Sequence, residues 1–256
     1  MVSLDKITKN NRAIFLPYDQ GLELGPDDVG ETAIDPDFIL KIAEQGGYNG
    51  IILQKGIAEK YYSKEKNKVP LILKLNGKTE LVSGDPISRQ VCSVDEAYEL
   101  GAKAVGYTIY IGSEHESVMM AEFGKIVEQA HKINLPVIAW CYPRGKSIKD
   151  ETAPDNVIYA ARVGLELGAD IVKIKYCGSE SCFAQAVKAA GKTKVMMAGG
   201  PKADKEEFLE RVRNVMAAGA IGVVVGRNIW LDKEPLKITE EIKKIVFNNK
   251  NKKNCF

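Results

Sequence analysis

Residues 136–175 read PVIAWCYPRGKSIKDETAPDNVIYAARVGLELGADIVKIK, and this stretch decides the fold. Apolar runs at 136–142 and 169–175 flank the amphipathic segment 155–167, which stops at a glycine just before the second run. Two short apolar runs joined in this way are typical of parallel strands with a crossover helix. The stretch therefore predicts one strand–helix–strand unit of an α/β protein.

The same alternation extends in both directions along the chain, and most amphipathic segments end at a glycine or proline stop. Further helices are expected at 36–46, 56–66, 94–101 after a capping box at Ser93 and Glu96, 115–133, 180–190, 204–218 and 236–247. Strands are expected at 13–19, 50–54, 70–76, 103–111, 136–142, 169–175, 194–198 and 220–226. Eight such units favour one (β/α)₈ barrel domain over residues 1–256, although periodicity alone leaves an open doubly wound sheet as the alternative.

The amino-acid composition argues against some classes of binding partner. With 36 Lys and Arg against 34 Asp and Glu, the net charge of +2 is too small for a surface built to bind nucleic acid. The basic end at about 249–256 is expected to be a frayed tail. No signal core or membrane-spanning run is visible, and five scattered cysteines argue against a disulfide framework or a zinc site. We expect a soluble, cytoplasmic protein that binds a small molecule.

Barrel enzymes carry their chemistry at the carboxyl ends of the strands, where this chain places two lysines. Lys173 lies within an apolar strand, and Lys175 points to the same side two residues later. Burial and a neighbouring like charge both lower the pKa of a lysine, and a neutral amine is what Schiff-base chemistry requires. We therefore expect Lys175 to help keep Lys173 neutral. The alternative is a pair of structural or anion-binding lysines at a strand end.

Trp140, Tyr142 and Arg144 share one parity on the preceding strand. A phenol beside a Schiff base can move protons, and an arginine there can clamp a phosphate through two parallel hydrogen bonds. The alternative is an aromatic pair packing the top of the barrel, with Arg144 in a surface ion pair. Asp19 ends the first strand, where a carboxylate could orient the water that leaves during imine formation, or simply cap a turn.

Two glycine-rich turns follow the seventh and eighth strands, Ala198-Gly199-Gly200-Pro201-Lys202 and Val225-Gly226-Arg227-Asn228. Glycines allow backbone N–H groups to approach an anion, and this pair of loops is the usual phosphate site of the barrel fold. The two histidines, His115 and His131, do not end strands, so a histidine-bound zinc site is not expected. Neither a GxGxxG turn nor a Walker A lysine supports a nucleotide cofactor.

Five motifs in order, between about residues 12 and 232, resemble the archaeal-type class I fructose-1,6-bisphosphate aldolases of the DhnA-like branch. These motifs are Tyr18-Asp-Gln-Gly-Leu-Glu-Leu-Gly-Pro26, Trp140-Cys-Tyr-Pro-Arg-Gly145, Gly168-Ala-Asp-Ile-Val-Lys173, Gly199-Gly200-Pro201 and Gly226-Arg227-Asn228.

The resemblance implies that Lys173 forms the imine, that Tyr142 donates and accepts protons, and that Asp19 assists them. It implies no metal and no other cofactor. The side chains and turns implied to bind the phosphorylated sugar are Gln20, Trp140, Arg144, Lys175, Ala198, Gly199, Gly200, Gly226 and Arg227, the last four holding one phosphate. Family members often have histidines in place of Gln20 and Leu24, which leaves open how the far end of the substrate is contacted.

Two other functions stay open from the sequence. A 2-amino-3,7-dideoxy-D-threo-hept-6-ulosonate synthase shares the imine lysine and the Tyr-Pro-Arg-Gly turn. A noncatalytic phosphosugar-binding barrel would keep only the fold and the phosphate site. The resemblance further implies a role in glycolysis or gluconeogenesis and a ring-like homo-oligomer.

Overall fold

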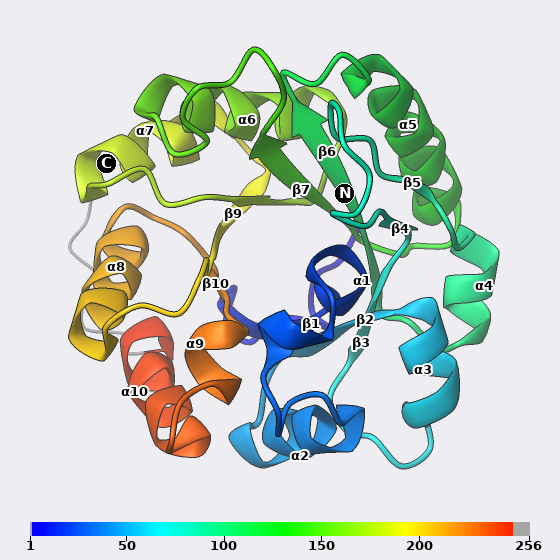
Figure 1. Cartoon of the computed structure of the whole chain (residues 1–256), viewed down its shortest axis with the longest axis vertical. Helices are drawn as coiled ribbons and strands as arrows, with labels where there is room; N and C mark the ends of the chain where they lie inside the picture. Colours follow the sequence, from blue (N-terminus) through cyan, green and yellow to red (C-terminus); the bar gives the residue numbers. More distant parts are fainter. Residues whose placement is uncertain (1, 248–256) are drawn as a thin grey trace.

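The computed structural model describes residues 2–247, and eight parallel strands close into a barrel around its centre (Figure 1). Their order is β1-β10-β9-β8-β7-β6-β3-β2, and the pairing of Ala13 with Gly222 joins the first strand to the last. This closure confirms the barrel and shows that the open-sheet alternative is wrong. The barrel strands are β1 (Ala13–Tyr18), β2 (Gly50–Gln54), β3 (Leu71–Lys74), β6 (Ala104–Ile111), β7 (Val137–Pro143), β8 (Ile171–Ile174), β9 (Lys194–Ala198) and β10 (Gly222–Val224).

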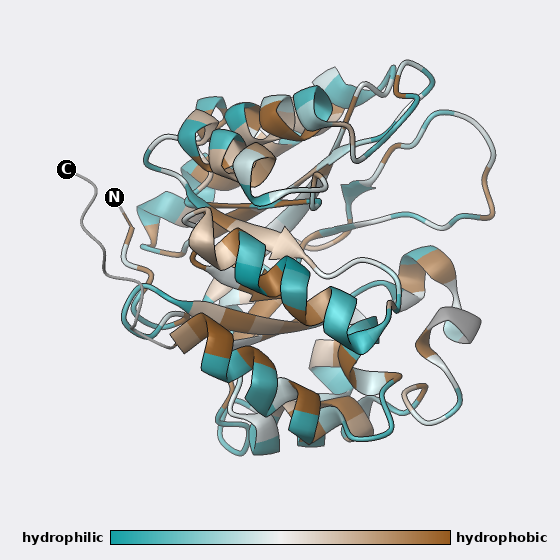
Figure 2. Ribbon diagram, turned by 90° about the vertical axis from the view of Figure 1, so that its left-hand side faces the viewer, coloured by the Kyte–Doolittle hydropathy of each residue, from teal (hydrophilic) through white to brown (hydrophobic). Residues whose placement is uncertain are grey.

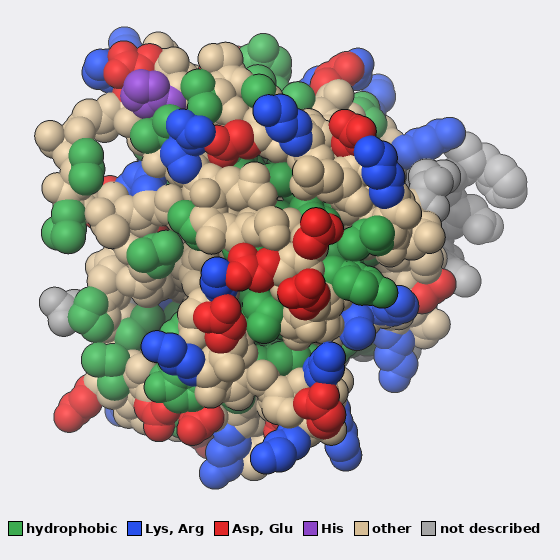
Figure 3. Space-filling view, turned by 90° about the vertical axis from the view of Figure 1, so that its right-hand side faces the viewer, with side chains coloured by type: hydrophobic (Ala, Val, Ile, Leu, Met, Phe, Trp, Pro, Cys, Tyr) green, Lys and Arg blue, Asp and Glu red, His purple; other side chains and the backbone are tan. Residues whose placement is uncertain are grey.

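Helices surround the barrel, with hydrophobic and hydrophilic residues alternating along them (Figures 1 and 2). The expected capping residue is confirmed, because the Ser93 hydroxyl accepts a hydrogen bond of 3.0 Å from the Glu96 backbone N–H. The outer surface mixes acidic and basic side chains on the face shown in Figure 3. The helices of six or more residues are α2 (Pro36–Gly46), α3 (Lys55–Tyr61), α4 (Val94–Glu99), α5 (Glu116–Lys132), α6 (Pro154–Glu166), α7 (Glu180–Ala189), α8 (Lys205–Ala217) and α10 (Pro235–Phe247).

The alternation of side chains along each strand divides the core in two. Val137, Ala139 and Cys141 of β7 pack outward against the helices, whereas Ile138 and Trp140 face the barrel interior. On β8 the same alternation turns Ile171 inward, and Lys173 shares its parity. The residues that the sequence placed on one side of these strands therefore do face the inside of the barrel.

The segment after β3 departs from the expected strand 70–76. The strand stops at Lys74, and Asn76 starts a two-residue strand, β4 (Asn76–Gly77), which pairs antiparallel with β5 (Arg89–Gln90). The fully buried Asn76 amide donates to the Ser88 and Thr108 carbonyl oxygens at 3.0 and 2.9 Å. Four-residue helices α1 (Gly21–Leu24), η1 (Pro26–Val29) and α9 (Arg227–Trp230) were also not predicted, because so short a segment shows no periodicity.

The expectation drawn from the cysteines also has to be corrected. Cys177 and Cys182 form a disulfide, with Cα atoms 6.1 Å apart, between the loop after β8 and the first turn of α7. An odd total of scattered cysteines argues against a framework of several bonds, but not against one local bond. Because disulfides are rare in a reducing cytoplasm, the cysteines do not support the expected cytoplasmic location. Cys92 and Cys141 are buried thiols, while Cys255 and the predicted frayed tail lie outside the described residues.

Two kinds of feature are absent from residues 2–247. No helix in that range is both long and apolar enough to cross a membrane. Over the same range, no group of three or more His, Cys, Asp and Glu side chains is arranged to hold a metal ion.

Candidate active site

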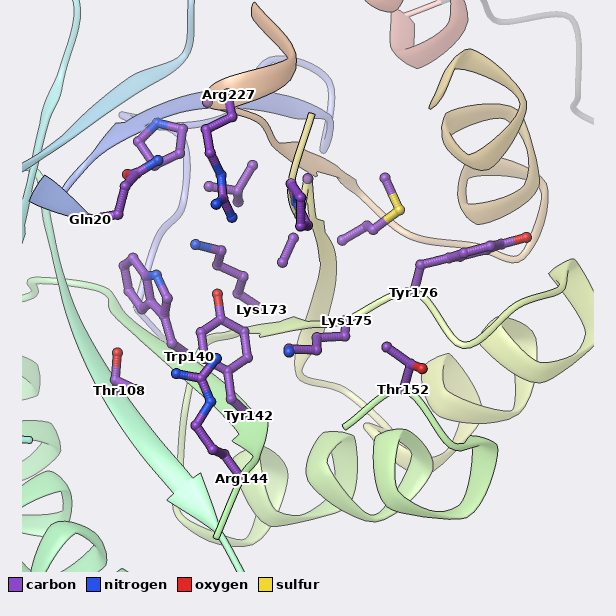
Figure 4. Close-up of a pocket in the computed structure, with 18 of the residues that line it drawn as sticks. Gln20, Thr108, Trp140, Tyr142, Arg144, Thr152, Lys173, Lys175, Tyr176 and Arg227 are labelled. Carbon is purple, nitrogen blue, oxygen red and sulfur yellow. The ribbon is translucent and has the colours of Figure 1, made fainter. Parts of the chain in front are cut away.

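A cavity of about 840 Å³ opens where the strands end at their carboxyl edges. Every site residue named from the sequence lines this cavity, and it includes side chains from the ends of β1, β3, β7 and β8 together with both glycine turns. Figure 4 shows labelled side chains from several strands and from the segments that follow them around Lys173. Alternation along the strands and the closure of the barrel are together sufficient to gather them.

Lys173 lies at the centre of this cavity. Its side chain is 6 % exposed, and its Nζ atom is 4.9 Å from the ring centroid of Trp140 and 5.8 Å from that of Tyr142. The pKa of Lys173 is lowered to about 8, mainly by burial; the charges of Lys74 and Arg227 also lower this pKa, whereas that of Asp19 raises it. At pH 7 a pKa of 8 leaves about a tenth of the amine neutral, roughly 300-fold more than an ordinary lysine. Lys173 can therefore act as a nucleophile near neutral pH.

Lys175 is not among the main influences on the pKa of Lys173, so its expected effect on that pKa stays a prediction. Lys175 lines the same cavity, but its amine is ion-paired with Glu151, which offsets its charge. The lysine whose charge lowers the pKa of Lys173 is Lys74, at the end of β3. Lys74 falls within the expected strand 70–76, but the sequence gives no reason to prefer it to Lys175, two residues from Lys173.

Lys74 and Asp19 form a buried ion pair beside the nucleophile. The Lys74 Nζ atom is 3.6 Å from Asp19 Oδ2, and the side chains are only 6 % and 9 % exposed. Lys74 also lies 5.5 Å from the Trp140 ring centroid, so both amines lie near the same indole. A buried cation needs a partner of opposite charge, which Asp19 supplies. Asp19 is thus close enough to both lysines to influence protonation in the cavity.

The Trp140 ring fits against the neighbouring strand β6 because that strand has a glycine at the point of contact. A Cβ atom at Gly106 of β6 would lie 1.9 Å from the indole ring, so only glycine leaves room for it. The indole Nε1 atom is buried and has no hydrogen-bond partner among the described residues. Buried donors are usually satisfied. The Trp140 N–H is therefore available to a ligand bound in the cavity.

Tyr142 supplies a hydroxyl group that keeps its proton. Burial raises the pKa of Tyr142 well above its usual value, and the charges of Asp19 and Glu23 raise it further. Figure 4 shows the Tyr142 ring beside the Lys173 side chain. A phenol with so high a pKa is protonated before substrate binds, so it can donate a proton to the substrate.

Arg144 is already bound by carboxylates. Its guanidinium donates from Nε to Glu151 Oε1 at 2.8 Å and from Nη1 to Glu23 Oε1 at 2.9 Å. Glu23 also accepts a 2.7 Å hydrogen bond from the Tyr110 hydroxyl. Arg144 therefore lines the cavity and also forms ion pairs, while its binding of a phosphate stays a prediction. Glu23 and Glu151 were missed, since a carboxylate in a four-residue helix or an irregular segment carries no pattern that separates it from surface residues.

The two glycine turns are joined by one buried amide. Asn228 donates to the carbonyl oxygens of Gly199 and Pro201, both at 2.9 Å, and accepts a hydrogen bond from the Ala203 N–H. Gly200 has a φ of +68°, a conformation that favours glycine. Ala198, Gly199, Gly200, Gly226 and Arg227 consequently line one side of the cavity as a single unit, as expected for a phosphate site.

Comparison with known proteins agrees with this geometry. Residues 13–232 match the DeoC/LacD family aldolase model. The chain is 49 % identical to the class 1 fructose-bisphosphate aldolase of Thermoproteus tenax over 245 residues, covering 94 % of this chain and 92 % of that protein. It is 42 % identical to the class 1 fructose-bisphosphate aldolase of Halobacterium salinarum over 243 residues, with the same coverage of 94 % and 92 %.

A solved structure extends the comparison to three dimensions. It is an archaeal fructose-1,6-bisphosphate aldolase whose catalytic lysine is covalently bound to the carbinolamine intermediate of the substrate. The two folds superpose with a TM-score of 0.92 at 48 % identity, covering 95 % of this chain and 97 % of that one.

Proposed function

The chain belongs to the DeoC/LacD aldolase family, and from this premise we propose that it is a Schiff-base-forming, class I fructose-bisphosphate aldolase. The reaction is the reversible cleavage of fructose 1,6-bisphosphate to dihydroxyacetone phosphate and glyceraldehyde 3-phosphate. The observation that carries the proposal is the buried Lys173, whose pKa is lowered to about 8 inside a cavity lined by Tyr142 and Asp19.

The first half of the reaction follows from the neutral amine. The Lys173 Nζ atom adds to the C2 carbonyl carbon of the ketose, and the carbonyl oxygen takes up a proton to give a carbinolamine. Loss of that oxygen as water gives an iminium ion. Asp19 is the carboxylate suited to orient the leaving water and to stabilise the positive nitrogen. Lys74 holds Asp19 in place through their ion pair.

The second half needs a group that accepts and returns one proton. In cleavage, Tyr142 takes the proton of the C4 hydroxyl, the C3–C4 electron pair moves to the iminium, and glyceraldehyde 3-phosphate leaves an enamine behind. The raised pKa of Tyr142 opposes this loss in the empty site, but the positive iminium on Lys173 favours it. The enamine is then protonated at C3 and hydrolysed. The glycine turns and Arg227 hold the phosphate of the ketone half, which aligns the reacting atoms.

Several finer expectations stay predictions. They are the absence of a cofactor, the roles of the individual substrate-binding residues, cytoplasmic location, a part in glycolysis or gluconeogenesis, and a homo-oligomer. The relatives' names favour the aldolase over the heptulosonate synthase. The paired lysine and tyrosine favour an enzyme over a noncatalytic sugar-phosphate sensor.

The proposal is tested by incubating the protein with fructose 1,6-bisphosphate in a metal chelator and measuring triose phosphate release. We expect undiminished cleavage, and a borohydride-reduced adduct with dihydroxyacetone phosphate located on Lys173 by mass spectrometry. A parallel assay adds aspartate semialdehyde as acceptor. Product formed only with that acceptor would support the synthase, and binding without a trapped adduct would support the sensor.

The pH dependence of borohydride trapping tests the charges around Lys173. Lys74→Met removes a charge that lowers the pKa of Lys173, so the neutral fraction falls and the profile shifts to higher pH, on the order of one unit. Asp19→Asn removes a charge that raises the same pKa, so its profile shifts to lower pH. Lys175→Met serves as the control and should leave the midpoint in place. A shift caused by Lys175→Met alone would support the interpretation based on the sequence.

A further inference from the structure

A substrate with a phosphate at each end requires a second anion site in addition to the glycine turns. Figure 4 places Arg227 and Arg144 on opposite sides of Lys173, with Lys175 on the Arg144 side. The carbons released as aldehyde must lie beyond the iminium, away from the phosphate of the ketone half. Arg144 and Lys175 are therefore the cations placed to receive the aldehyde-end phosphate, an inference that rests on the proposed function.

Both Arg144 and Lys175 are already bound by one side chain, that of Glu151. Glu151 accepts hydrogen bonds from Arg144 Nε at 2.8 Å and from Arg144 Nη2 at 3.3 Å through its two carboxylate oxygens. The second of these oxygens also accepts from the Lys175 amine. This two-oxygen arrangement on a guanidinium is the geometry in which arginine binds phosphate. Glu151 thus holds the position that a phosphate would need.

Charge prevents both anions from binding together. Arg144 is also ion-paired with Glu23 and lies 3.6 Å from Glu80, which pairs with Lys78, so the three carboxylates already balance the three cations here. A phosphate would add a charge of about −1.5 to −2. Burial raises the pKa of Glu151, but Arg144 and Lys175 outweigh it and lower that pKa. Protonation near neutral pH therefore does not remove the Glu151 charge, and one carboxylate has to move.

Glu151 is the carboxylate that can move. Glu23 lies on α1 and is also held by the Tyr110 hydroxyl, whereas Glu151 lies in the irregular segment between β7 and α6. Its side chain is 32 % exposed, and those of Arg144 and Lys175 are 31 % and 25 % exposed. Ion pairs this accessible to water are only modestly stabilising. A phosphate can replace Glu151 at low cost.

We propose that the Glu151 carboxylate occupies the site of the aldehyde-end phosphate in the empty enzyme and is displaced when that phosphate binds. With a non-phosphorylated aldehyde Glu151 stays in place. The residue therefore weakens binding of glyceraldehyde 3-phosphate selectively, which also speeds its release after cleavage. Glu151 acts as a specificity-determining residue and takes no part in the proton transfers.

The test is a comparison of aldehydes in the synthesis direction, with dihydroxyacetone phosphate saturating. Glu151→Gln removes the competing charge, so KM for glyceraldehyde 3-phosphate should fall about 5-fold. KM for glyceraldehyde, KM for dihydroxyacetone phosphate and kcat should change little. Glu151→Asp keeps the charge on a shorter side chain and should give an intermediate KM. Glu166→Gln, which breaks an exposed pair with Arg162 on α6, is the matched control.

Each alternative role of Glu151 gives a different result. If Glu151 only holds Arg144 and Lys175 in position, KM for glyceraldehyde 3-phosphate rises in Glu151→Gln, which overturns the proposal. If Glu151 binds the hydroxyl groups of the sugar, KM rises for both aldehydes, which also overturns it. Wild-type protein that makes no hexose phosphate at all would refute the proposed function instead, so the two failures are distinguishable.

Discussion

Lys173→Met is expected to lose essentially all aldolase activity, with kcat falling by at least about 10⁴-fold, because the covalent route has no other nucleophile to use. The side chain is buried and close to Trp140, and methionine has a similar length without the amine. Borohydride should no longer fix dihydroxyacetone phosphate to the protein. Trapping and turnover are both measured, because a loss of turnover alone would not identify the covalent step.

Two controls separate this loss from misfolding. Removing a buried amine also removes its desolvation cost, so the unfolding temperature of Lys173→Met should be unchanged or higher. Lys175→Met alters a lysine of the same cavity and should still be trapped by borohydride. An adduct that persists in Lys173→Met, or appears on Lys74 instead, would contradict the assignment of the nucleophile.

Much of the fold was predictable because the information is local. Most barrel strands are short apolar runs with a stop before them, and the parities of Trp140 and Tyr142 on β7 and of Lys173 on β8 follow from alternation within each strand. The strand 70–76 was predicted too long, because the turn after Lys74 depends on the Asn76 amide reaching Ser88 and Thr108 in other segments. Nothing in the local pattern around Asn76 indicates those partners.

The same distinction explains the candidate site. Its members at strand ends were found, since the barrel brings all carboxyl ends to one edge. Their electrostatic partners were not, because pairing between Lys175 and Glu151, or between Asp19 and Lys74, is decided by loops and by strands far apart in sequence. Sequence proximity therefore suggested Lys175 as the charge acting on Lys173, whereas the closed barrel brings Lys74 to that role.

Tyr142→Phe is expected to separate the two halves of the reaction. Removing the hydroxyl takes away the group that accepts the C4 hydroxyl proton and protonates the enamine, so kcat should fall by about 10² to 10⁴-fold. Formation of the imine uses the Lys173 amine and Asp19 but not the Tyr142 hydroxyl, so borohydride trapping with dihydroxyacetone phosphate should persist. Exchange of the C3 hydrogen of dihydroxyacetone phosphate with deuterated water, followed by NMR, reports the proton step directly and should be lost.

The matched control is Tyr107→Phe, which removes a buried hydroxyl on the neighbouring strand β6. That hydroxyl donates to Glu122 at 2.7 Å and to the Ser88 carbonyl oxygen at 3.2 Å, and Tyr107 does not line the cavity. Its loss should cost about 1 kcal/mol of stability and leave C3 exchange intact. Because both variants lose one phenol oxygen from adjacent strands, only a role in proton transfer explains a defect confined to Tyr142→Phe. C3 exchange that continued in Tyr142→Phe would assign the proton to another group, with Asp19 the nearest carboxylate to test.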